Sequence, residues 1–205
     1  WICEVVGIAP GQSERNKAYA KSLGLPFLSK KERPPLAVVG GGPSVLDYKD
    51  ELTNWPGDVW VSGSAFPLVS SFVPNAVFFT IDQSTDLAKD GKGAKKALLA
   101  SCCDPSVFDT LKYAEITIFD VITGGPDSNH HATTITAAPK VGLDMGYRDM
   151  TFFGCEGSFL STTHAYETTP IKDMIIVRCN ERNFVTRPSF LMQCEFMSRV
   201  VQLNP

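Results

Sequence analysis

The amino-acid sequence predicts an α/β fold: a Rossmann-like, doubly wound domain with a largely parallel sheet and helices on both faces. Apolar segments alternate along the chain with segments that have helix-start signals or helical periodicity. Central apolar segments such as 36–39 and 76–81 show no strict polar–apolar alternation, which is typical of strands buried on both faces. A chain of 205 residues with 43% hydrophobic residues can bury one core of this kind.

Residues 1–35 are predicted to form an N-terminal extension ahead of a Rossmann-like nucleotide-binding domain at residues 36–205. An apolar stretch at residues 3–9 indicates an edge strand, and Gln12–Leu23 has a helical pattern that ends at a glycine. The mainly basic segment Lys30–Arg33 lies between prolines, so we expect a linker there.

The main domain is expected to alternate strands and helices throughout. Strands are expected at residues 36–39, 58–61, 76–81, 97–101, 114–121, 150–154, 174–177 and 184–186. Helices or short turns are expected at residues 45–52, 65–72, 105–111, 129–145 and 189–201. The segment 129–145 is rich in small residues, which favours a helix packed closely on the sheet, and Pro139 predicts a distortion within it.

The segment after the first strand of the main domain has the features of a phosphate-binding turn. Leu36–Val39 runs directly into three glycines, a proline and Ser44, which can cap the helix that follows. Uncovered backbone amides and a helix N-terminus both favour an anion. Tight packing of strand against helix is the alternative explanation for these glycines. Together with the end of the next strand, the predicted nucleotide-binding residues are Gly40, Gly41, Gly42, Pro43, Ser44, Ser62, Gly63 and Ser64.

Two common cofactor motifs are absent. The third glycine of the dinucleotide-binding motif GxGxxG is missing, and Ser62 stands where NAD enzymes place an acidic residue for the ribose. The sequence also lacks GxxxxGK[ST], which excludes a P-loop. We therefore expect a nucleotide site of another type, at the carboxyl ends of the parallel strands where ligands bind in such sheets.

Two carboxylates and one histidine are candidates for the chemistry. Asp82 and Glu156 each follow an apolar strand, and a carboxylate at such a place can bind Mg²⁺, so both are candidate metal ligands. Asp82 is also a candidate catalytic residue. A helix cap or a solvated turn residue is the alternative for each. His164, in a polar loop, is a candidate general base or partner of a leaving phosphate, with a surface histidine as the alternative.

Composition and charge exclude several classes of partner. The chain has 19 basic and 22 acidic residues, a balance without the footprint of a nucleic-acid-binding protein. No apolar stretch reaches the length needed to span a membrane, so we expect neither a membrane nor a nucleic-acid partner. The six cysteines form no CxxC pattern and lie mostly in apolar runs, which predicts buried free thiols and a cytoplasmic location. A zinc site or a disulfide framework is the alternative.

The order of these motifs resembles a known family over residues 36–200. Gly41–Val45 resembles the G-x-G-P-S-L opening of the archaeal 6-hydroxymethylpterin diphosphokinase-like proteins, which are related to the bacterial flagellin motility accessory factors. The same Gly-Pro-Ser turn occurs in bacterial sialyltransferases that use CMP-sugars. Asp82 matches the family's strand-end aspartate, and residues 132–146 and 150–156 resemble its A…A…lG…I…iG-x-D stretch. Thr163–Ala165 and residues 185–190 resemble its closing elements.

The resemblance implies a transferase that uses a nucleotide donor. In the diphosphokinase form, ATP binds at Gly40–Ser44, Mg²⁺ is bound by Asp82 and Glu156, and a diphosphate moves to a small hydroxyl acceptor. In the glycosyltransferase form, the donor is a CMP-nonulosonic sugar and His164 assists the transfer. A non-catalytic nucleotide-binding domain is the third hypothesis. Ser64 and Glu156 depart from the family, which often has Asn and usually has Asp at these places.

Positive charge is scarce at the predicted site. None of the strand-end turns named above contains a lysine or an arginine. Phosphoryl transfer depends on positioning and on neutralising the phosphate charge. The sequence therefore predicts that a metal ion, or one of Arg178, Arg182 and Arg187 near the C-terminal end, supplies this charge.

Overall fold

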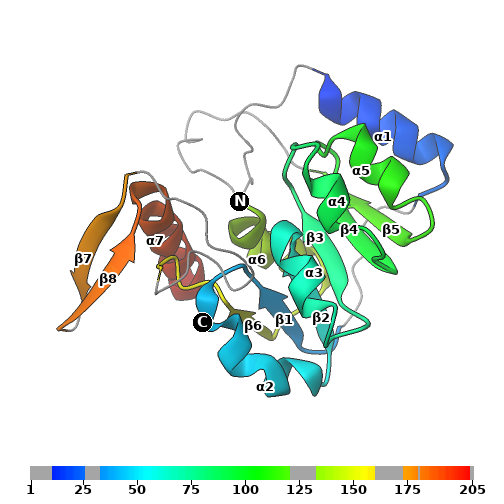
Figure 1. The fold of residues 1–205 in the computed structure, drawn as a ribbon. Coiled ribbons are helices and arrows are strands. Elements are labelled where there is room, and N and C mark those ends of the chain that lie inside the picture. Colours follow the sequence, from blue (N-terminus) through cyan, green and yellow to red (C-terminus); the bar gives the residue numbers. More distant parts are fainter. Residues whose placement is uncertain (1–10, 26–32, 121–132, 160–172, 180, 204–205) are drawn as a thin grey trace.

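A computed structural model describes residues 11–25, 33–120, 133–159, 173–179 and 181–203 of the chain. Its centre is a six-stranded parallel sheet with the strand order β5-β4-β3-β2-β1-β6 (Figure 1). The strands are β1 Leu36–Val39, β2 Asp58–Ser62, β3 Val77–Thr80, β4 Lys96–Ala100, β5 Glu115–Phe119 and β6 Met150–Phe153. This sheet confirms the predicted Rossmann-like α/β fold.

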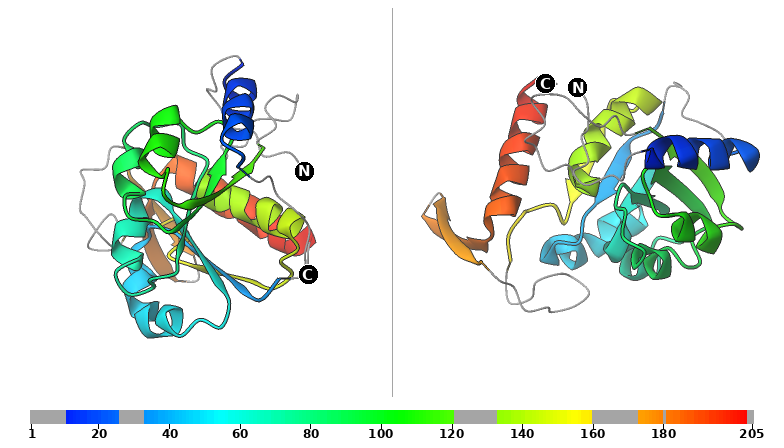
Figure 2. Two further views of the ribbon diagram at one scale, coloured as in Figure 1. Left: turned by 90° about the vertical axis from the view of Figure 1, so that its right-hand side faces the viewer. Right: turned by 90° about the horizontal axis from the view of Figure 1, so that it is seen from above.

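Helices cover both faces of the sheet. The described helices are α1 Gln12–Ser22, α2 Lys49–Thr53, α3 Phe66–Val69, α4 Leu87–Asp90, α5 Pro105–Thr110, α6 Thr134–Met145 and α7 Pro188–Leu203, with the 3-10 helices η1 Pro43–Tyr48 and η2 Gly63–Ala65. Figure 2 shows α2 to α5 along one face and α6 with α7 along the other. None of the described helices is long and apolar enough to cross a membrane.

The core lies on both faces of the central strands, as the uninterrupted apolar segments predicted. Every residue of β1 is buried. Trp60 on β2 and Phe79 on β3 are almost fully buried, and their ring centroids lie 5.1 Å apart. The ring of Tyr147, at the end of α6, meets Trp60 edge-on at 5.2 Å. Aromatic packing of this kind fixes α6 against the middle of the sheet.

Several predicted elements differ from the structure. The helix predicted at 129–145 begins at Thr134 among the described residues, because Thr133 forms a capping box with Thr136. Segments 174–177 and 184–186 pair with each other as an antiparallel hairpin, β7 Ile175–Cys179 and β8 Arg182–Thr186, separate from the main sheet. The strand predicted at 3–9 lies outside the described residues.

The order of the strands places a topological switch between β1 and β6. From β1 the chain adds β2 to β5 on one side, and β6 then pairs with β1 on the other side. Ligands of open parallel sheets bind in the crevice beyond the carboxyl ends of the strands near such a point. The predicted site residues that are described lie at these carboxyl ends.

Helix α1 packs on the ends of β4 and β5, although it lies within the predicted extension. Ala20, on its inner side, is fully buried. Ser13 and Asn16 are also buried, and both form hydrogen bonds with residues that follow β4. The helix is therefore attached to the same body as the sheet, and the boundary at residue 35 stays a prediction.

Candidate functional site

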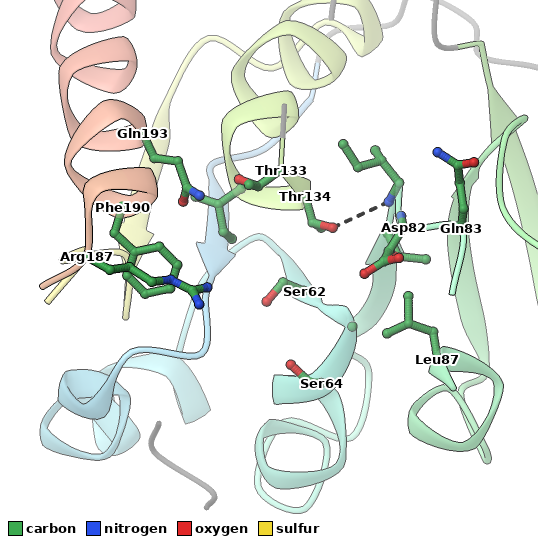
Figure 3. A pocket seen from close by; sticks show the side chains of 14 residues that line it. Ser62, Ser64, Asp82, Gln83, Leu87, Thr133, Thr134, Arg187, Phe190 and Gln193 are labelled. Atoms are coloured by element: carbon green, nitrogen blue, oxygen red, sulfur yellow. Dashed lines mark hydrogen bonds between the residues drawn. The ribbon is translucent and has the colours of Figure 1, made fainter. Parts of the chain in front are cut away.

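A cavity of about 700 Å³ lies at the carboxyl ends of β2 and β3. Its floor comes from Ser62 to Ser64 and from Thr80 to Gln83, and its roof comes from the first residues of α6. Arg187, Phe190 and Gln193, at the start of α7, form the opposite wall. Figure 3 shows these three side chains across the cavity from Asp82 and Gln83. The size falls within the range of small-molecule sites.

Asp82 is the carboxylate of this cavity. Its backbone N–H donates to Thr80 Oγ1 at 3.1 Å, and its Oδ1 accepts the N–H of Ser84 at 2.9 Å. These two bonds fix the turn after β3 and orient the carboxyl group. The residue is exposed, so its carboxylate oxygens remain accessible to a ligand in the cavity.

The N-terminus of α6 faces the cavity. Thr133 Oγ1 accepts the N–H of Thr136 at 3.3 Å, and Thr136 Oγ1 accepts the N–H of Thr133 at 2.7 Å. Thr134 and Ile135 are the first two residues of α6, so their N–H groups have no carbonyl acceptor one turn earlier within the helix. Both residues line the cavity. The helix end therefore adds partial positive charge to the roof.

Arg187 supplies a cation to the cavity. Its guanidinium carbon lies 4.2 Å from the centroid of the Phe190 ring, and that ring lies 5.3 Å from the ring of Phe159. Stacking on an aromatic face holds a guanidinium in place while leaving its N–H groups available. Of the three arginines considered from the sequence, Arg187 lines the cavity, Arg178 is exposed on β7, and the side chain of Arg182 lies outside the described residues.

The glycine turn after β1 is engaged by the protein itself. Glu156 accepts two hydrogen bonds from Ser44, one from the backbone N–H at 2.9 Å and one from Oγ at 3.0 Å. A Cβ atom on Gly42 would lie 2.4 Å from Glu156 Oε2, and one on Gly40 would lie 2.4 Å from the carbonyl oxygen of Gly154. Close packing of the β1 and β6 turns thus requires these glycines, and a carboxylate already occupies the donors of Ser44.

A smaller cavity of about 150 Å³ lies beside the first, next to the glycine turn. Gly41, Gly42 and the turn after β6 line it. The two cavities share four lining residues, which are Ser64, Ile135, Phe190 and Gln193. The predicted turns after β1 and β2 therefore contribute to adjoining cavities, although Gly40, Pro43 and Ser44 line neither.

The two predicted metal ligands are not brought together. Asp82 lines the larger cavity, whereas Glu156 bonds Ser44 and lines neither cavity. Within the described ranges, no group of three or more His, Cys, Asp or Glu side chains is placed to bind a metal ion. His164 lies outside the described residues. Asp82 with nearby hydroxyl groups still fits Mg²⁺, which is usually bound by one or two carboxylates together with substrate phosphates and water.

On the two walls that face Asp82, sequence reasoning named only Arg187. Thr133, Thr134, Phe190 and Gln193 line the cavity, but none of them was predicted as a site residue. A capping box usually has Glu or Gln at its fourth position, and here that position is Thr136, so the helix start was weakly signalled.

Comparison with protein-family models, curated proteins and solved structures finds no match to this chain.

Proposed function

We propose that this chain is a nucleotide-dependent transferase whose donor phosphates bind in the larger cavity. The observation that carries the proposal is the placement of Arg187 and the N-terminus of α6 around one cavity that also contains Asp82. Cation, helix amides and carboxylate meet at the edge of the sheet where such folds bind nucleotides.

The donor that the resemblance suggests first is ATP, with diphosphate transfer to a small acceptor. The acceptor hydroxyl oxygen attacks the β-phosphorus, the bond between that phosphorus and the oxygen bridging to the α-phosphate breaks, and AMP leaves. Arg187 and the amides of Thr134 and Ile135 bind the phosphate oxygens. Asp82 would bind Mg²⁺, and the metal ion would neutralise part of the phosphate charge. His164 remains the candidate that accepts the hydroxyl proton.

A CMP-nonulosonic sugar is the second candidate donor, and the charge of the site favours it. The described lining of the larger cavity contains one cation, Arg187, and one carboxylate, Asp82. Glu156 is held by Ser44 and contributes no second carboxylate there. A single phosphate diester needs less positive charge than a triphosphate. Transfer of the sugar to a hydroxyl acceptor, with CMP as leaving group, also needs no metal.

A thermal-shift panel tests the proposal. ATP, CTP, GTP and CMP are each added with and without Mg²⁺, to the wild type and to Arg187→Ala and Asp82→Asn. Stabilisation by ATP only with Mg²⁺, lost in both variants, supports diphosphate transfer. Stabilisation by CMP without metal, lost in Arg187→Ala, supports sugar transfer.

The matched control is Arg199→Ala on α7, the helix that begins directly after Arg187. Arg199 is exposed and pairs with Glu195 one turn away, so its removal changes the charge of α7 without changing the cavity. Its nucleotide response should equal that of the wild type. If no nucleotide stabilises the wild type, neither transferase proposal stands.

A further inference from the structure

Helix α1 is attached to the turn after β4 by two carboxamide side chains. Gln12 Nε2 donates to the carbonyl oxygen of Cys102 at 2.7 Å, and Asn16 Nδ2 donates to that of Cys103 at 2.6 Å. Asn16 is only 4% exposed. A buried carbonyl that loses such a donor is left unsatisfied, so α1 and this turn depend on each other.

A second group of polar contacts fixes the position of α1 along the sheet edge. Ser13 Oγ lies 2.7 Å from Ser101 Oγ, and Ser101 Oγ donates to Asp120 Oδ1 at 2.8 Å. Lys17 forms an ion pair with the same carboxylate of Asp120. Ser13 and Ser101 are buried, and buried polar groups require matched hydrogen-bond partners, so this network favours one position of α1 on the sheet edge.

The Cys102–Cys103 turn, which follows β4, also contacts the end of β3. Ladder pairing between these strands ends with Thr80 and Leu99. Beyond that point, Cys103 Sγ donates to the carbonyl oxygen of Thr80 at 3.6 Å, and Cys102 Sγ donates to that of Ile81 at 3.2 Å. Both cysteines are fully buried. Their thiols and close packing continue the connection between the two strands past the ladder.

The end of β3 is the wall of the larger cavity that carries Asp82. Ile81 N–H donates to Thr134 Oγ1 at 3.4 Å, and Asp82 N–H donates to Thr80 Oγ1 at 3.1 Å. Thr80, Ile81 and Asp82 all line the cavity. A continuous series of contacts therefore leads from the side chains of α1, through the Cys102–Cys103 turn, to Asp82.

We propose that α1, acting through the Cys102–Cys103 turn, is a positioning element that holds the Asp82 strand end in its binding geometry. No residue of α1 lines the cavity. Ligand affinity at the cavity nevertheless depends on whether α1 is packed against the Cys102–Cys103 turn. The effect of α1 on ligand affinity rests on the proposed function, whereas its effect on the strand end does not.

Amide hydrogen exchange in the full chain tests the effect on the strand end. The amides of Ile81, Asp82 and Ser84 have named partners, so their exchange rates report whether the turn stays closed. In the double variant Gln12→Ala/Asn16→Ala we expect these rates to rise about fivefold or more, with Val39 unchanged. Gln12→Ala alone, the milder variant, should change the rates in the same direction.

Tyr19→Phe is the matched control on the same helix. It removes an exposed hydrogen bond to Asp109 at 3.1 Å without touching the Cys102–Cys103 turn. The three exchange rates should stay within about twofold of the wild type in this control. If Gln12→Ala and the double variant speed exchange in α1 and at Cys103 but leave the three amides at wild-type rates, α1 is only a structural cap and the proposal is overturned.

The second arm measures affinity for ATP with Mg²⁺, or for CMP, whichever stabilises the wild type. The double variant should raise the dissociation constant about fivefold, and Tyr19→Phe should leave it unchanged. Faster exchange with an unchanged dissociation constant would overturn the claim that ligand affinity depends on α1. If neither probe stabilises the wild type, the proposed function fails, and the exchange rates alone decide the positioning role.

Discussion

Replacing Glu156 separates its two interpretations, a structural acceptor for Ser44 or a metal ligand. Two hydrogen bonds from Ser44 reach its carboxylate, at 2.9 and 3.0 Å. A hydrogen bond to a charged group contributes about 1.5–3 kcal/mol, and two that share one side chain add less than twice that. Glu156→Ala should therefore lower the free energy of unfolding by about 3 kcal/mol. For a 205-residue chain this lowers Tm by about 6–12 °C.

Conservative variants divide this loss between the two bonds. Glu156→Gln keeps one acceptor oxygen and should lose about 1–2 kcal/mol. Ser44→Ala keeps the backbone bond and should lose about 1 kcal/mol. In a double-mutant cycle the losses from Ser44→Ala and Glu156→Ala should not add, because both remove the same hydroxyl contact. Urea unfolding followed by circular dichroism, in buffer with a metal chelator, measures each value.

The chelator makes the result decisive. If Glu156 served only to bind a metal, its carboxylate would not stabilise the fold once the chelator has removed the metal. Glu156→Ala would then have a urea midpoint equal to that of the wild type or above it. Such a result, within about 0.5 kcal/mol of the wild type, would refute the structural role inferred from the two hydrogen bonds.

Three further outcomes follow from individual contacts. Burial raises the pKa of Cys102 to about 12, so its thiol should stay unmodified by a thiol reagent at pH 8 until the protein is unfolded in guanidinium; rapid modification of the folded protein would contradict this. Desolvation acts to raise the pKa of Asp120, but Lys17 and two serine hydroxyls outweigh it and hold the pKa below its usual value. The stability from this group is therefore complete above the unfolded pKa of about 3.9 and is lost as pH falls through the folded pKa. Urea titrations across this range should show the loss in the wild type and less of it in Asp120→Asn. Gly42→Ala places a Cβ 2.6 Å from a backbone oxygen and should destabilise by about 1–3 kcal/mol in the same assay, whereas an unchanged midpoint would show that the turn can open.

The sheet could be predicted from the sequence because its strands are buried on both faces. Leu36–Val39 and Val77–Thr80 stand out as apolar runs ended by small or polar residues, and such runs carry their own signal. The order of the strands carries no such local signal. The strands of the hairpin β7–β8 are as short as those of the sheet, and strand length alone does not say which partner a strand pairs with.

The candidate site could be predicted only on its strand-end side. Ser62, Ser64 and Asp82 were found because each follows an apolar strand. Arg187 was one of three equivalent arginines, since charge alone does not say which of them reaches the cavity. The bond between Ser44 and Glu156 joins residues that are distant in sequence, and an open phosphate turn would have the same glycines. Long-range contacts of this kind are set by how α6, α7 and the β6 turn pack.

The pairing of β6 with β1 also constrains the order in which the chain can fold. Leu36 pairs with Met150, so one edge of β1 stays without a partner until synthesis has passed β6. Contacts between such distant residues form slowly, and an unpaired strand edge can bind other chains. Every residue of β1 is buried in the complete fold. A fragment that ends before β6 would leave β1 as an open edge of the sheet. Shortened versions of this protein should therefore keep β6, or they will aggregate before they fold.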